Sequence, residues 1–193
     1  MNTAAFEVHP LSPDRWPDLV QLFGPRGACG GCWCMWWRLS RSEYDEMKGD
    51  VNRQAFEEIV RSGEAPGLLL YAEGQPAGWC SIGPREDFPA LERSRILKRV
   101  DEEPVWSVVC FFIEKSHRCQ GLTVRLLQAA LDYAARNGAK IIEGYPHDEA
   151  GEKAPEAFVF TGLVGAFREA GFQEVARRSP KRPVMRYYIG TQP

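Results

Sequence analysis

The hydrophobic and polar positions of the chain follow two periods, one typical of helices and one typical of strands. After Ser12-Pro13, apolar residues recur at the spacing of one helical face: Trp16, Leu19, Val20 and Phe23. The same spacing predicts further helices over residues 42 to about 61, from about 121 to 137, and over 161–170.

Short apolar runs between turn residues predict the strands. Residues 68–71 and 77–82 form two of them, joined by a hairpin turn, and 105–113 is apolar at nearly every position, as expected for a strand covered on both faces. Further strands are predicted at 140–145, 172–177 and 184–189. The order β α α β β β α β α β β predicts an α/β (mixed α+β) fold, with a central mixed sheet of about seven strands flanked by helices.

Composition narrows the class of protein. At 193 residues, the chain is expected to form a single domain over 1–193. Its 24 Lys and Arg against 26 Asp and Glu give a net charge of −2, which argues against a nucleic-acid partner. No apolar stretch approaches the roughly 18 residues of a membrane span, and the first residues lack the pattern of a secretory signal. We therefore expect no membrane partner, a cytoplasmic location and free thiols at the six cysteines.

A basic loop between the buried strand and the next helix is the most informative segment. Phe111, Phe112 and Ile113 end the strand, and the helix begins near Gly121. Unpaired backbone N–H groups at such a junction can cradle an anion, and glycine lets the main chain approach a phosphate closely. From these residues alone, a diphosphate site and an ordinary corner with solvated charges are equally open.

The pattern Arg118-x-x-Gly121-x-Thr123 is similar to the Arg/Gln-x-x-Gly-x-Gly/Ala signature of the GNAT superfamily of N-acetyltransferases. Thr123 departs from the usual Gly or Ala, but the order of elements resembles that family from end to end. The resemblance implies acetyl-CoA as co-substrate, with its pantetheine arm along the main chain of Phe111, Phe112 and Ile113. It places the pyrophosphate on the backbone of Arg118, Cys119, Gln120, Gly121, Leu122 and Thr123. GNAT-like proteins are often dimers, so a homodimer is among the expected partners.

The implied reaction is direct transfer of an acetyl group to an amine of a small molecule or peptide. A primary amine is mostly protonated near neutral pH, so the reaction needs a base. Glu143 is the predicted base, because it is a lone carboxylate in an apolar strand, at a position where many GNAT enzymes carry a glutamate. The alternative is an outward-facing glutamate. Phe167 stands where the family often has a tyrosine acid, which leaves Tyr145 and His147 as candidates; both also fit packing or loop roles.

Three cysteines and three tryptophans are crowded into residues 29–38. We predict that this segment forms an apolar wall of the acceptor pocket: Trp33, Met35 and Trp36, with Arg38 near the rim. The alternative is that the aromatic rings only close the core. No metal is predicted, because Cys29, Cys32 and Cys34 lack a fourth ligand at a familiar spacing.

Two other functions remain open from the sequence. The missing tyrosine makes an acyl-CoA-binding GNAT-like protein with little catalysis a credible alternative. A metal-binding or redox module built on the cysteine-rich segment is the second. The polar loop at 146–155 is either a lid, part of the acceptor pocket or a solvated excursion.

Overall fold

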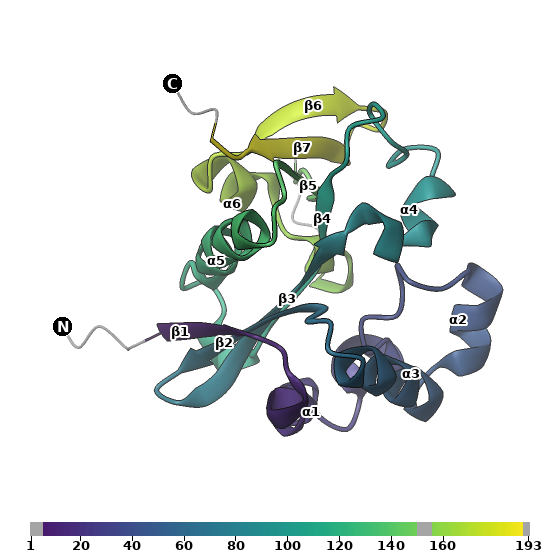
Figure 1. Cartoon of the computed structure of the whole chain (residues 1–193), viewed down its shortest axis with the longest axis vertical. Helices are drawn as coiled ribbons and strands as arrows, with labels where there is room; N and C mark the ends of the chain where they lie inside the picture. The colour runs from purple at the N-terminus through teal and green to yellow at the C-terminus, as the bar shows by residue number, and fades with distance from the viewer. Residues whose placement is uncertain (1–5, 150–155, 191–193) are drawn as a thin grey trace.

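The computed structural model describes residues 6–149 and 156–190 (Figure 1). Seven strands form one sheet in the order β1-β2-β3-β4-β5-β7-β6, in which only the β4–β5 pair is parallel. The strands are β1 (Phe6–Pro10), β2 (Gly67–Ala72), β3 (Gln75–Pro84), β4 (Trp106–Ile113), β5 (Ile141–Gly144), β6 (Gln173–Arg177) and β7 (Pro183–Tyr188). The mixed sheet and the number of strands confirm the sequence-based prediction.

Helices cover both faces of this sheet. They are α1 (Trp16–Phe23), α2 (Arg41–Met47), α3 (Asp50–Arg61), α4 (Pro89–Glu92), α5 (Leu122–Arg136) and α6 (Val164–Glu169). α5 and α6 lie on one side of the sheet, and α1 and α3 lie on the other (Figure 1). In the described part of the chain, every helix is too short or too polar to cross a bilayer.

Two expectations for the helices were wrong in detail. The helix predicted over 42–61 is two helices, because Gly49 takes a φ of +90° and breaks the chain between α2 and α3. The short helix α4 lies in a polar segment that showed no helical period.

Apolar side chains fill a layer on each face of the sheet. On one face, Leu126 and Leu127 of α5 pack with Ile82 and Phe111 of the central strands. On the other face, the core forms around Trp79, which is fully buried. Removal of this much apolar surface from water stabilises the sheet that carries the site.

Candidate active site at the separation of two strands

β4 and β5 pair over three residues and then separate. Their parallel pairing ends at Val108 opposite Gly144, and β4 continues to Ile113 without β5 beside it. The register of β4 against β3 shifts at the same place, which leaves a bulge at Val109. The strand residues predicted to bind the cofactor all lie beyond this point: Phe111, Phe112 and Ile113. The main chain of this stretch therefore has an edge that β5 does not cover.

The predicted anion loop follows directly from that edge. Gly121 takes a left-handed conformation with a φ of +74° and precedes the first turn of α5. Cys119 also has a positive φ, of +59°. Five consecutive backbone N–H groups donate no hydrogen bond to any described residue: those of Cys119, Gln120, Gly121, Leu122 and Thr123. The sequence-based prediction of an anion cradle therefore has a matching geometry.

Side chains hold the loop in this shape. The carboxylate of Glu114 accepts hydrogen bonds from the backbone N–H and the hydroxyl of Ser116. Arg118 Nε donates to the carbonyl of Ile113 at 3.2 Å, and Gln120 Nε2 donates to the carbonyl of Ser116 at 3.1 Å. A Cβ atom placed on Gly121 would meet nothing within 4 Å. The mouth of the loop is thus open space beside the positive end of a 15-residue helix.

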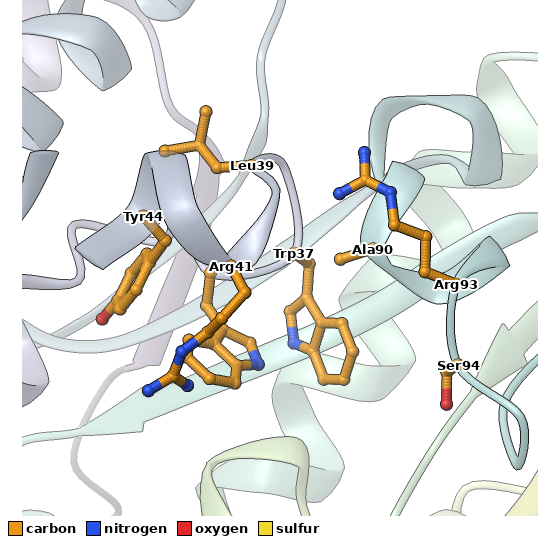
Figure 2. Close-up of a pocket in the computed structure, with 8 residues that line it drawn as sticks. Trp37, Leu39, Arg41, Tyr44, Ala90, Arg93 and Ser94 are labelled. Atoms are coloured by element: carbon orange, nitrogen blue, oxygen red, sulfur yellow. The ribbon is translucent and has the colours of Figure 1, made fainter. Parts of the chain in front are cut away.

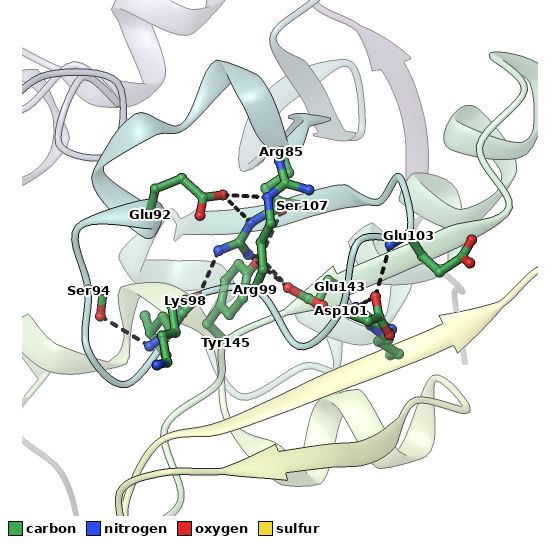
Figure 3. Close-up of polar contacts among 12 residues, drawn as sticks. Arg85, Glu92, Ser94, Lys98, Arg99, Asp101, Glu103, Ser107, Glu143 and Tyr145 are labelled. Carbon is green, nitrogen blue, oxygen red and sulfur yellow. Dashed lines mark hydrogen bonds and ion pairs between the residues drawn. The ribbon is translucent and has the colours of Figure 1, made fainter.

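Glu143 lies on β5 at the separation point but is closed off from solvent, with an exposed fraction of 0%. Its Oε1 accepts from Arg85 Nη1 at 2.9 Å and from the Tyr145 hydroxyl at 2.8 Å (Figure 3). Its Oε2 accepts from Arg186 Nε at 2.8 Å. Glu143 is thus completely buried rather than outward-facing, and its carboxylate lies between the guanidinium groups of two buried arginines.

Tyr145 belongs to the same buried network. Its hydroxyl is 2.8 Å from Ser107 Oγ and accepts from Arg85 Nη1 at 2.6 Å (Figure 3). Burial, reinforced by the negative charge of Glu143, raises the pKa of Tyr145 well above its usual range. The ring is fully buried. These contacts give Tyr145 a packing and bonding role, and its predicted catalytic role stays a prediction.

The network ties a long loop to the sheet. Arg85 also donates to Glu92 at 2.8 Å and to the carbonyl of Leu97 at 2.9 Å. Arg186 makes a two-pronged ion pair with Asp101, at 2.6 and 2.9 Å. The segment between β3 and β4, which includes α4, is therefore fixed to β5 and β7 through Glu143. Sequence reasoning missed Arg85 and Arg186 because they lie far from Glu143 in the chain.

The four residues predicted to bind the acceptor lie in different environments: some are in the core and one lines a cavity. Trp33 and Met35 are buried in the core, where Trp33 packs beside Trp16 and Phe23, so they do not form a pocket wall. Arg38 has 9% of its side chain exposed and lies over the Phe88 ring. Its Nε and Nη2 are buried and make no hydrogen bond within the part of the chain that the structure describes.

Trp36 is the member of that set that lines a cavity. This aromatic cavity, of about 250 Å³, lies between the start of α2 and α4 (Figure 2). Its lining residues are Trp36, Trp37, Leu39, Arg41, Tyr44, Ala90, Arg93 and Ser94. Our prediction did not include Trp37 in the cavity wall. Its position next to Trp36 in the tryptophan-rich segment was the signal that could have identified it. No pattern in the sequence indicated that α4 contributes to the wall of this cavity.

Trp37 connects the aromatic cavity to the open strand. Its indole Nε1 donates to the carbonyl of Val109, at the bulge of β4, with a distance of 3.1 Å. Its own carbonyl accepts from the N–H of Ala90 at 3.1 Å. One side chain therefore bridges the place where β4 leaves β5 and the cavity that α4 completes.

The cysteines of the crowded segment do not gather into a metal site. Cys29 is exposed, Cys34 is buried, and Trp79 Nε1 donates to Cys34 Sγ at 3.0 Å. Burial raises the pKa of Cys32 to about 11. Within residues 6–149 and 156–190, no three His, Cys, Asp or Glu side chains are grouped so that they could hold a metal ion. All six cysteines are free thiols, as expected.

Phe167 fills the position where a tyrosine acid was sought. It is fully buried, and its ring packs against Gly144 and Phe111. The His147 side chain is partly exposed, but its Nδ1 is buried and has no hydrogen-bond partner among the described residues. Its backbone N–H donates to the carbonyl of Gly162, a residue that closely approaches Phe111. Residues 150–155 of the predicted lid or pocket loop lie outside the described residues.

A protein-family model matches more than half of the chain. The model of the acetyltransferase (GNAT) family matches residues 33–153. No curated protein matches the chain in sequence. Among solved structures, a GNAT-family acetyltransferase from Listeria monocytogenes is 13% identical, with a TM-score of 0.58 over 97% of this chain and 98% of that one.

Two further structures were solved with a bound coenzyme. The putative acetyltransferase yncA from Salmonella typhimurium, with acetyl-CoA, is 14% identical, with a TM-score of 0.56 over 97% of this chain and 96% of that one. The PaiA N-acetyltransferase from Thermoplasma acidophilum, with coenzyme A, is 14% identical, with a TM-score of 0.53 over 95% and 99%. At these identities the likeness shows the fold.

Proposed function

The chain belongs to the GNAT acetyltransferase family, and from that premise we propose that it transfers an acetyl group from acetyl-CoA to an amine of a small molecule or peptide. The observation that carries the proposal is a run of five backbone N–H groups, at residues 119–123, that donate no hydrogen bond to any described residue. They follow the part of β4 that β5 does not pair with. A cytoplasmic location and a homodimer stay predictions.

The residues present fit acetyl-CoA. A Cβ on Gly121 would meet nothing within 4 Å, so there is open space beside the loop where a pyrophosphate could accept hydrogen bonds from its N–H groups. The main chain of Phe111 and Ile113 lies on the β4 edge that β5 leaves uncovered, so it is placed to pair with the amides of the pantetheine arm as an added strand would. Such pairing uses only main-chain groups, so it is compatible with the apolar side chains of Phe111 and Ile113.

The chain's own contribution to the reaction is mainly to bind and orient. Acetyl-CoA, when bound, supplies the activated thioester. A backbone N–H near Phe111 and Phe112 is the proposed donor to the oxyanion that forms at the thioester carbonyl. Alignment of the amine with the thioester accounts for a large share of the rate in such a bimolecular transfer.

For proton transfer, the contacts favour His147 over Glu143. Glu143 accepts from two arginines and a tyrosine and has no exposed surface, which supports a positioning role more directly than the base role. His147 is the titratable side chain that we propose for proton transfer. Its side chain is partly exposed, its buried Nδ1 has no partner within residues 6–149 and 156–190, and it adjoins the Gly162 segment beside Phe111.

The test is turnover of acetyl-CoA with a panel of small-molecule amines and lysine-containing peptides, in which mass spectrometry detects the acetylated product. An amine-dependent product supports the proposal and assigns the acceptor class. A folded protein that binds acetyl-CoA but acetylates no amine would contradict it. That result would favour the acyl-CoA-binding alternative, which the buried Phe167 supports because it leaves the tyrosine acid's position without a titratable group.

A further inference from the structure

The aromatic cavity has a chemistry that points to a particular acceptor. Three of its eight lining residues are aromatic: Trp36 meets Tyr44 edge to face at a centroid distance of 4.9 Å, and Trp37 adjoins Trp36 at 6.5 Å. A volume of about 250 Å³ lies below the range usual for drug-sized ligands, so the occupant is small. Such walls favour a flat or branched apolar body.

Two arginines flank these rings, and none of the described lining residues carries a carboxylate. Arg41 and Arg93 lie on opposite sides of Trp37 (Figure 2). The Arg41 guanidinium stacks 5.0 Å from the Trp36 ring, while its Nε bonds Asp45 at 2.7 Å. Arg93 is exposed and makes no hydrogen bond or ion pair with any residue in the described ranges.

One acid near Arg93 interacts with it electrostatically. Glu43 and Arg93 attract each other, but the Glu43 carboxylate is engaged at the start of α2, where it accepts a hydrogen bond from the backbone N–H of Ser40 at 2.7 Å, and Glu43 is not among the lining residues of the cavity. Because Arg41 is already paired with Asp45, a cationic ligand would meet the guanidinium of Arg93 with no carboxylate among the described lining residues, which costs binding free energy. An anionic ligand would gain a charge-assisted hydrogen bond.

We propose that the acceptor is a small amine that carries both an aromatic or branched apolar body and a carboxylate, as an aromatic α-amino acid does. The rings hold the body, Arg93 binds the carboxylate, and Trp37 places the ligand one side chain from the β4 bulge at Val109. The inference rests on the proposed acetyltransferase function, and it excludes polyamines and basic peptides as preferred acceptors.

The test compares two probes of the same shape, L-phenylalanine and L-phenylalaninamide, which differ in the carboxylate. Each is titrated by calorimetry into the protein saturated with coenzyme A. We expect phenylalanine to bind about fivefold more tightly. Arg93→Gln should abolish this preference. Arg136→Gln, an exposed arginine at the end of α5, should keep it.

Trp36→Ala should weaken both probes, and Trp36→Phe should restore them. Equal affinities for the two probes, or a preference that survives Arg93→Gln, would overturn the anionic part of the proposal. Failure of both probes to bind the coenzyme-loaded protein would overturn all of it and leave the acetyltransferase function standing. If the folded protein binds no coenzyme A, that function fails instead, and the same comparison on the protein alone decides the ligand class.

Discussion

Glu143 shows what a single residue can and cannot reveal from sequence. Its place in an apolar strand left two interpretations open, a partly buried base and an outward-facing glutamate. Its partners were hidden, because Arg85 and Arg186 lie 58 and 43 residues away in the chain. Burying a carboxylate and two guanidinium groups costs desolvation free energy, and removing one of these charges afterwards strongly destabilises the folded protein. Its main consequence is to fix the loop that carries α4.

Glu143→Gln should therefore act on stability and on acceptor binding. The variant removes the buried negative charge shared by Arg85 and Arg186, which keep only their partly exposed partners Glu92 and Asp101, and we expect a loss of about 3 kcal/mol in the free energy of unfolding. The KM for the acceptor should rise more than kcat falls, because the cavity wall loosens. Glu92→Gln is the matched control: Glu92 also pairs with Arg85, but its side chain is 42% exposed, so the loss should stay below about 1 kcal/mol.

Denaturant unfolding and a pH profile of kcat/KM separate the two roles of Glu143. A positioning residue leaves the shape of the profile unchanged. A variant with wild-type stability whose profile loses one limb would show instead that Glu143 is the base.

At the scale of elements, the period of apolar residues located the strands and helices well and their breaks less well. The pattern continues across residues 48–49, so one helix was predicted where there are two. The break depends on a distant contact, because the N–H of Gly49 donates to the carbonyl of Gly31 at 3.1 Å. Local sequence does not encode such a bond. α4 escaped prediction for a similar reason: distant residues hold it in place.

Two glycine variants test the break. Gly49→Ala should lower the free energy of unfolding by about 1 kcal/mol or more, because φ is +90° and alanine is strained there although no atom obstructs its Cβ. Gly165→Ala lies within α6, where a Cβ is equally unobstructed, and should stabilise by up to about 1 kcal/mol. Thermal or denaturant unfolding measures both. A Gly49→Ala variant at least as stable as wild type would indicate one continuous helix.

The loop between β3 and β4 should also respond to pH through Asp101. Its hydrogen bonds from Arg186 hold the pKa of Asp101 below the usual range. A lowered folded-state pKa means that the ion pair stabilises fully above the unfolded-state value, about 3.9, and that this stabilisation is lost as the pH falls through the folded-state value.

Asp101→Asn should therefore cost up to about 1 kcal/mol at pH 6 and progressively less as the pH drops below about 4. Urea unfolding from pH 3 to 6 measures the difference. Asp132→Asn, an exposed residue on α5, serves as the control. A cost for Asp101→Asn that is constant across this range would show that the ion pair does not contribute.

At the scale of the whole molecule, the separation of β4 from β5 positions the parts of the candidate site relative to one another. It uncovers the strand edge, places the loop at residues 118–123 beside it, and puts Trp37 at the bulge. The sequence could predict the order of elements and the loop, because both are local patterns. It could not predict the aromatic cavity or the ionic network, because each joins segments that only the fold brings together.

The most direct test of this account is calorimetric titration of acetyl-CoA into the wild-type protein, Gly121→Asp and Gly138→Asp. Both glycines have a positive φ and open space at the Cβ position, and they lie at opposite ends of α5. We predict saturable binding by the wild type and by Gly138→Asp. Gly121→Asp should bind at least about tenfold more weakly, because its carboxylate occupies the place of the pyrophosphate. Equal binding by all three folded proteins, or none by the wild type, would contradict the placement of acetyl-CoA on this loop.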